Sequence, residues 1–216
     1  MNDNNIETQY DLTKKSKFRI FYDSNKTAIY SIVLVLVILI SSLIFYIDHK
    51  KKKVLLLSNK YIQAKIYIES ENSDEALNLL NDLILSNNST YSTLSLFLIL
   101  DKNLITDHKE LSDLFDYLLK NNKYEEEVKN LLIYKKALVE SNFLNEAELL
   151  SSIKTLIESD TIWRVHALFL LGDYYISKNE TQKAQDFYTK VLNIKDLQRN
   201  LYDQARTKLS LINNVN

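Results

Sequence analysis

The sequence predicts an all-helical protein with one membrane-spanning helix near its N-terminus. Twenty consecutive residues, 28–47, carry no charge, Gly or Pro, and apolar residues recur at helical spacing through the rest of the chain. The 216 residues include no Pro and a single Gly, Gly172, whereas sheets and tight turns usually need both residue types. Helical hairpins can turn through Asn, Asp and Ser instead, and this chain is rich in all three.

Residues 28–47 predict a transmembrane helix. A helix of this length is about 30 Å long, which matches the hydrocarbon core of a bilayer. Fourteen of the 20 residues are Leu, Ile, Val or Phe, and their transfer into lipid gains on the order of 4–8 kcal/mol. A buried core helix would usually show a polar face, which this run lacks. A cleaved signal peptide would have a shorter apolar region followed by small residues at the cut.

The segments on either side of this span are polar. Residues 1–27 predict a short tail, and residues 48–53 form a basic junction that contains Lys50 to Lys53. A block of lysines at the end of a span is typical of contact with lipid headgroups. The positive-inside rule compares Lys and Arg on the two sides of a span. Their numbers are nearly equal here, so charge alone leaves the orientation open.

Residues 54–216 predict a domain of about four helical hairpins. A large residue on a first helix can fill the space that a small residue on the second helix opens, so that the two backbones approach. Such pairs recur nine residues apart, at Tyr67 with Ala76, Leu138 with Ala147 and Tyr175 with Ala184. The spacing of 37 residues from Ala147 to Ala184 is typical of a helix-turn-helix solenoid. The final helix, over 198–212, is expected to cap the array.

The last hairpin resembles a tetratricopeptide (TPR) repeat. Its Leu171, Gly172, Tyr175, Ala184 and Tyr188 fall where the TPR pattern has Leu, Gly, Tyr, Ala and an aromatic residue. The earlier units are degenerate, and none of the hairpins has the closing proline of the pattern. The resemblance implies a TPR-like solenoid over residues 54–216, while an unrelated helical bundle is the alternative.

A TPR-like solenoid implies a binding groove lined by the first helix of each hairpin. Carried over to this chain, the groove positions are His166, Phe169, Asp173 and Ile176 in the last unit, Lys129, Leu132, Lys136 and Val139 in the third, and Tyr61, Lys65 and Ile68 in the first. This mixture of apolar and charged side chains could accept a peptide or a partner helix. Alternatively, so short an array closes the groove on its own side chains.

The layout of the whole chain resembles the TPR-like ancillary subunit of the bacterial Sec translocon. The resemblance covers the tail, the single span, the basic junction and the hairpins, and it includes Trp163, Arg164 and Ala167 at the start of the last unit. It implies a cytoplasmic N-terminus, an inner-membrane span and a periplasmic domain. It also implies association with the translocation channel and with periplasmic chaperones. The family has no established catalytic residues to carry over.

The sequence provides little support for catalysis or for cofactor, metal or nucleic-acid binding. One Gly cannot build a phosphate-binding loop, and His49, His108 and His166 show no metal-ligand spacing. The chain has no Cys, so no thiolate can bind a metal. Residues 54–216 hold 18 Lys and Arg against 23 Asp and Glu, a formal charge of −5. Nucleic-acid binding usually requires a basic surface instead.

These observations predict a non-enzymatic, single-pass membrane protein that holds other proteins near the secretion channel. A scaffold for envelope assembly or division would have the same fold and topology. An enzyme whose site is assembled from scattered polar residues is an alternative of another class. A domain in the reversed, cytosolic orientation is a further one. We expect no small-molecule substrate and no cofactor.

Overall fold

The computed structural model describes residues 17–215, and all of the regular structure in this range is helical. Residues 1–16 of the predicted tail lie outside the described residues, as does Asn216. The helices are α1 (Lys17–Glu69), α2 (Ser73–Leu85), α3 (Ser89–Asp101), α4 (His108–Asn121), α5 (Glu126–Glu140), α6 (Glu146–Glu158), α7 (Trp163–Ser177), α8 (Thr181–Leu192) and α9 (Arg199–Val215). The predicted all-α fold class is confirmed.

The chain divides into two compact units, residues 1–56 and residues 57–216. Helix α1 contributes to both, because it runs without a break from Lys17 to Glu69. No Pro or Gly interrupts this stretch, so each residue can join the backbone hydrogen bonding of its neighbours. One helix therefore contains the end of the predicted tail, the predicted span, the basic junction and the first helix of the predicted solenoid.

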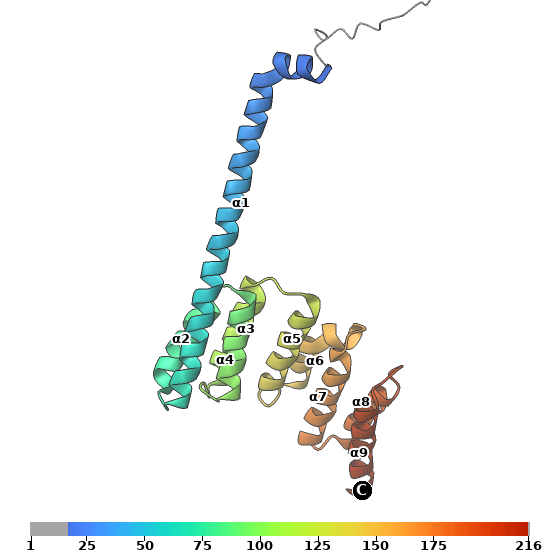
Figure 1. Ribbon diagram of the computed structural model, residues 1–216. Coiled ribbons are helices and arrows are strands. Elements are labelled where there is room, and N and C mark those ends of the chain that lie inside the picture. Colours follow the sequence, from blue (N-terminus) through green and yellow to red (C-terminus); the bar gives the residue numbers. More distant parts are fainter. Residues whose placement is uncertain (1–16, 216) are drawn as a thin grey trace, which may run out of the picture. The chain divides into compact units, whose positions relative to one another are not determined.

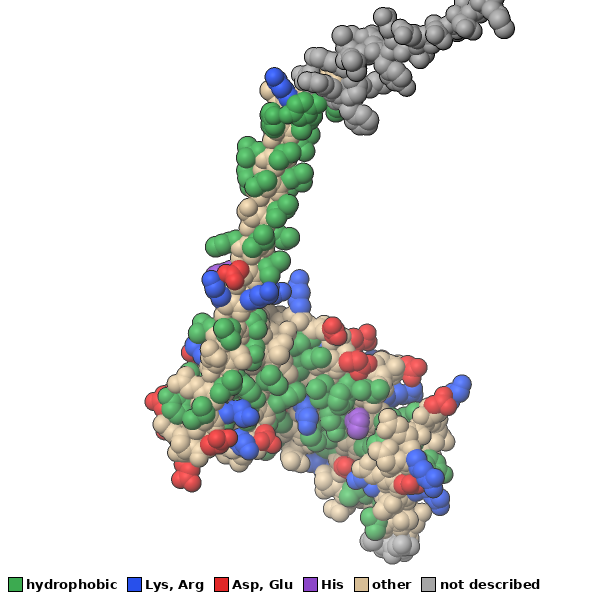
Figure 2. Space-filling view, in the orientation of Figure 1, with side chains coloured by type: hydrophobic (Ala, Val, Ile, Leu, Met, Phe, Trp, Pro, Cys, Tyr) green, Lys and Arg blue, Asp and Glu red, His purple; other side chains and the backbone are tan. Residues whose placement is uncertain are grey.

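The apolar part of α1 is long enough to cross a membrane. Every large hydrophobic side chain from Ile32 to Ile47 is exposed, and none of the apolar segment is buried. Figure 2 shows hydrophobic side chains on the visible sides of this part of the helix, with Lys side chains after it. This composition and length fit the predicted span.

The second unit consists of helical hairpins followed by a last helix (Figure 1). The hairpins are the end of α1 with α2, then α3 with α4, α5 with α6, and α7 with α8, and α9 packs against α8. Two hydrophobic cores hold them together. One core joins α1 to α5 and includes Leu80, Ile99 and Phe115, and the other joins α5 to α9 and includes Ile153 and Leu171. This arrangement agrees with the predicted helical-repeat domain and its final capping helix.

Asparagine replaces glycine in the turns between these helices. Asn87, Asn103 and Asn179 adopt left-handed φ angles of 53°, 50° and 61°, and Glu71 and Asp196 adopt 60° and 56°. Asn tolerates this conformation better than most residues with a side chain, because its short amide can hydrogen-bond locally. The chain therefore forms tight helix ends without the glycine that commonly provides them.

The structure places the small residues of the repeat pattern differently in different hairpins. Ala76 and Ala184 are fully buried, and each is the fourth residue of its helix. The fourth residue of α6 is Leu149, which is also fully buried, whereas Ala147 is exposed. The expected packing role of Ala147 is therefore wrong. Two residues correspond to about 200° around a helix, so Ala147 points away from the core that Leu149 enters.

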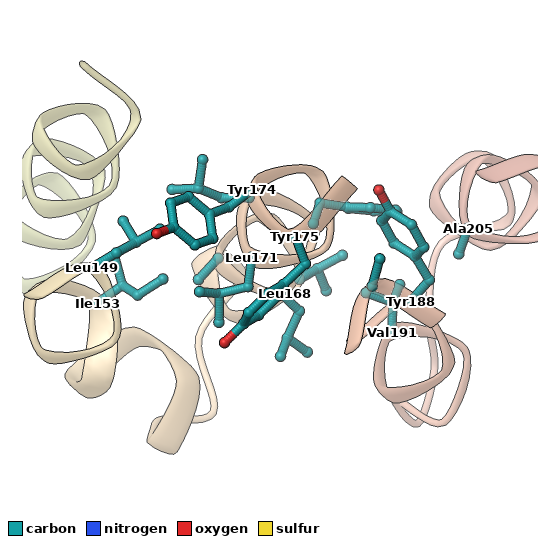
Figure 3. Close-up of a cluster of buried hydrophobic side chains, with 14 of the residues drawn as sticks. Leu149, Ile153, Leu168, Leu171, Tyr174, Tyr175, Tyr188, Val191 and Ala205 are labelled. Carbon is teal, nitrogen blue, oxygen red and sulfur yellow. The ribbon is translucent and has the colours of Figure 1, made fainter. Parts of the chain in front are cut away.

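The last hairpin is the most tightly packed. A Cβ atom on Gly172 would lie 2.3 Å from Cε1 of Tyr188, so the ring of Tyr188 occupies the space that this glycine leaves. Tyr175 stacks on Phe187 of α8, with 5.4 Å between the ring centroids, and Leu171 is almost completely buried. Figure 3 shows the labelled side chains of α7 lying between those of α6 and those of α8.

Candidate protein-interaction grooves

The helical unit has two apolar grooves on its surface. The first groove lies between α3 and α5, with a volume of about 500 Å³. The second groove lies between α7 and α9, beside Thr181 and Tyr188 of α8, with a volume of about 360 Å³. Apolar walls with a few polar groups are typical of sites that bind peptide side chains.

The α3–α5 groove combines exposed aliphatic side chains with one internal hydrogen bond. Leu94 of α3 and Val128 of α5 are 40% and 37% exposed, and Phe97 lies beside them. Thr93 donates a hydrogen bond from Oγ1 to the hydroxyl oxygen of Tyr124, over 3.1 Å. Burial raises the pKa of Tyr124 above the usual value of a tyrosine. The walls of the groove are mostly apolar, and Lys123 and Glu125 add one charge of each sign.

The α7–α9 groove has apolar walls above a charge-balanced base. The Asp173 carboxylate accepts hydrogen bonds from the Tyr188 hydroxyl and from the Lys208 ammonium, both over 2.5 Å. Burial and then the Asp173 carboxylate raise the pKa of Tyr188, which keeps its proton on the hydroxyl. Ile176 and Leu211 are exposed on either side. Because Asp173 and Lys208 neutralise one another, the groove favours an uncharged apolar group.

The predicted groove residues of α7 lie in two different places. Asp173 and Ile176 line the α7–α9 groove. His166 instead contacts the rings of Tyr134 and Trp163, with centroid distances of 5.7 and 5.5 Å. Burial in this cluster lowers the pKa of His166. Phe169 is 5% exposed and faces the Tyr188 ring, so it belongs to the core.

The predicted groove residues of α5 face away from the α3–α5 groove. Leu132 is fully buried in the core with α3 and α4, and Lys136 forms an ion pair with Asp116 of α4 over 2.5 Å. The open side of α5 carries Val128 and Leu131 instead, which line the α3–α5 groove. Each of these lies one residue before a predicted position, and one residue turns the helical face by about 100°. Lys129 and Val139, on the same predicted face, also lie outside the groove.

The predicted residues of α1 contribute to neither groove. Tyr61 lies against Tyr91 of α3, with 6.2 Å between the ring centroids, and Ile68 packs against the first core. Lys65 is exposed. Sequence reasoning missed the residues of α3 and α9 that line the two grooves, because neither helix belongs to a unit with a readable repeat pattern.

Each of the three histidines has different aromatic neighbours. His49 stacks on Phe45 of its own helix, at 6.4 Å, and His108 stacks on Phe143, at 3.6 Å. Within residues 17–215, no group of three His, Cys, Asp or Glu side chains is arranged to hold a metal ion.

Comparisons with known proteins returned no match. The chain matches no protein-family model, and neither a curated protein nor a solved structure is significantly similar to it.

Proposed function

We propose that this protein is a membrane-anchored adaptor that binds other proteins through the α3–α5 and α7–α9 grooves. The observation that carries this proposal is the α3–α5 groove of about 500 Å³, which is lined by the exposed aliphatic side chains of Leu94 and Val128. Exposed hydrophobic surface of this kind is typical of sites that bind peptides or partner helices. Apolar anchors of a partner would bury these two side chains.

The membrane anchor in this proposal is the apolar part of α1. Its large side chains are exposed all around the helix, and lipid would cover them at a gain proportional to their area. Tyr30 and Tyr46 lie 16 residues apart near its two ends, which corresponds to about 24 Å along a helix. Aromatic rings at both ends of a span favour the two headgroup regions of a bilayer.

The partners and the orientation that we propose are those implied by the resemblance to the ancillary translocon subunit. The N-terminus would lie in the bacterial cytoplasm, and the helical unit would lie in the periplasm. There the adaptor would bind both the Sec translocon and periplasmic chaperones, and would thereby raise the concentration of the chaperones near the translocon. The supporting observation is the order of tail, span, lysine junction and helical hairpins along the chain. The grooves need no catalytic group for this task.

Two measurements test the anchor and its orientation. Carbonate washing should leave the full chain in the membrane pellet, and only detergent should release it. A phosphatase fused after Asn216 should be active outside the cytoplasm, whereas a fluorescent protein fused there should not fluoresce. Release by the wash would refute the anchor. If the fluorescent fusion fluoresces and the phosphatase fusion is inactive, the helical unit lies in the cytoplasm and the proposed orientation is wrong.

Photo-crosslinking tests the groove itself. A photoreactive amino acid at Leu94 or Val128 should link the protein to translocon subunits or chaperones in intact membranes. Leu85 of α2 provides a matched control, because it is an exposed aliphatic residue outside both grooves. Equal crosslinking from all three positions would contradict the proposed site. Crosslinks from the groove to envelope assembly or division proteins, with none to the translocon, would favour the scaffold instead.

A further inference from the structure

The start of α1 is bent, and the bend precedes the apolar run of residues 28–47. Figure 1 shows the first turns of this helix running across the direction of the turns that follow. The hydroxyl groups of Tyr22 and Tyr30 are hydrogen-bonded over 2.5 Å, and 6.3 Å separates the centroids of the two rings. In a straight helix, eight residues correspond to about 12 Å, and both rings would lean toward the N-terminus. The contact between the two tyrosines therefore requires the bend.

Two polar side chains at the bend explain its position. Ser24 donates a hydrogen bond from Oγ to the carbonyl oxygen of Phe21 over 3.1 Å, and Asn25 donates to the same oxygen from Nδ2, also over 3.1 Å. In a regular helix this oxygen accepts only the backbone N–H four residues later, which belongs to Asn25. Side chains that compete for such a carbonyl are a common cause of helix bends. The residues of this segment thus favour a bent helix.

The bend keeps apolar side chains close to the level of Tyr30. Ile20, Phe21 and Tyr22 are 56%, 63% and 42% exposed. Because Tyr22 contacts Tyr30, these three residues lie near the end of the proposed span, where aromatic rings favour the headgroup region. A straight helix would carry Phe21 roughly 13 Å beyond Tyr30. Exposed apolar side chains at headgroup depth gain free energy when lipid covers them.

We propose that residues 17–27 lie on a membrane surface that contains anionic lipids, with Ile20 and Phe21 in the headgroup region. This inference rests on the proposed anchor, because the span sets the depth of Tyr30. Residues 14–26 contain five Lys and Arg and one Asp, so their formal charge is +4. Basic segments with exposed aromatic and aliphatic residues are typical of helices that lie in the interface, where anionic headgroups attract them. Contact with the surface would hold this end of the span at a fixed depth.

The absence of cysteine in the chain allows a depth measurement. Single variants Phe21→Cys, Ala28→Cys and Leu36→Cys of the full chain receive a nitroxide label in vesicles of phosphatidylcholine and phosphatidylglycerol. Collisions with oxygen and with a neutral, water-soluble nickel complex give the depth of each label. The label at position 21 should lie within about 5 Å of the depth of the label at position 28, whereas a straight helix would place it about 10 Å farther into the water. Glu75→Cys on α2 is an exposed control that should report water.

Two further comparisons separate contact with lipid from the bend itself. Ile20→Asp in the Phe21→Cys background should raise the collision rate with the nickel complex by about threefold or more, because anionic headgroups repel the new carboxylate. Ile20→Leu is the matched control and should leave this rate unchanged. Vesicles of phosphatidylcholine alone should also raise the rate at position 21, because they do not attract the basic residues.

Three results would overturn the proposal. The label at position 21 could be as accessible to the nickel complex as the label at position 75. It could instead be shielded from both oxygen and the nickel complex, which would mean that protein covers it. Equal collision rates with and without phosphatidylglycerol would overturn the preference for anionic lipids. The label at position 36 distinguishes the two proposals: if it reports water, the anchor fails, and if it reports the lipid interior while position 21 reports water, only the surface segment fails.

Discussion

The α7–α8 hairpin and the α5–α6 hairpin have similar lengths but pack in different ways. Helix α7 buries nine of its 15 residues, whereas α5 buries only Asn130, Leu132 and Ala137. In the last hairpin, Gly172 admits the Tyr188 ring, so the neighbours on both helices determine which residues fit. Helix α5 has no such contact and instead lies between the two cores. Tight packing between two helices produces a clear repeat pattern in the sequence, whereas packing against two cores makes this pattern less clear.

The largest expected effect comes from filling the gap at Gly172. In Gly172→Val, the added Cβ would meet the Tyr188 ring at 2.3 Å, and the overpacking should lower the free energy of unfolding by about 3 kcal/mol. Chemical denaturation of the full chain in detergent measures this loss. The double variant Gly172→Val with Tyr188→Ala should recover part of it, because the smaller side chain restores space. A variant as stable as the natural chain would contradict the close contact.

The next effect compares two neighbouring positions of α6. Leu149→Ala should destabilise the protein by about 3 kcal/mol, because it leaves a cavity in the core. Ala147→Leu should change the stability by less than about 0.5 kcal/mol, because that side chain points outward. Denaturation of both variants gives the comparison. The reverse ranking would restore Ala147 to the packing role that the sequence pattern suggested.

Removing one hydroxyl from the last hairpin should have a smaller and pH-dependent effect. The Tyr175 hydroxyl donates to the Glu146 carboxylate over 2.8 Å, so Tyr175→Phe should cost about 1.5 kcal/mol at pH 7. Burial and then this carboxylate raise the pKa of Tyr175 to about 12. The folded chain therefore keeps a proton that the unfolded chain loses above pH 10, and stability falls between pH 10 and 12. The natural chain should lose stability more steeply in this range than the Phe variant.

Two ion pairs contrast the packing around α5 with that around α8. The Lys136 side chain is 20% exposed and contacts both Asp116 and Glu140, whereas the Lys183 side chain is 46% exposed. Lys136→Met should therefore destabilise the protein by about 1 kcal/mol, and Lys183→Met by less than about 0.5 kcal/mol. Thermal unfolding at low and high salt checks both values. A larger loss at Lys183 would indicate that exposure does not govern these pairs.

The smallest effect concerns the turn between α1 and α2. Glu71 adopts a φ of 60°, in the same left-handed region as Asn179 in the turn between α7 and α8. Asn accepts this conformation at a lower cost than Glu, so Glu71→Asn should stabilise the protein by about 0.5 kcal/mol. Asn179→Glu should destabilise it by a similar amount. The midpoints of denaturation of the two variants should move in opposite directions.

Some residues of the two grooves could be predicted from the sequence, and others could not. Asp173 and Ile176 line the α7–α9 groove as expected, because the pattern around Leu171 and Gly172 specifies which side of α7 packs. The face of α5 was placed one residue away, since apolar residues on two of its sides give no single periodicity. Leu211 of α9 was missed because only the docking of that helix makes it a groove wall.

The sequence by itself determined the helical class, the hairpin order and a segment apolar enough for lipid. These properties depend on local features, namely the absence of Pro, the nearly complete absence of Gly and the length of an uncharged run. Only the tertiary structure decided which side of each helix stays open. That choice depends on neighbouring helices that lie far away in the chain. Lys136, for example, pairs with Asp116 of α4 and not with the groove, and Ile62 and Ile66 stay exposed because no helix within residues 17–215 packs against them.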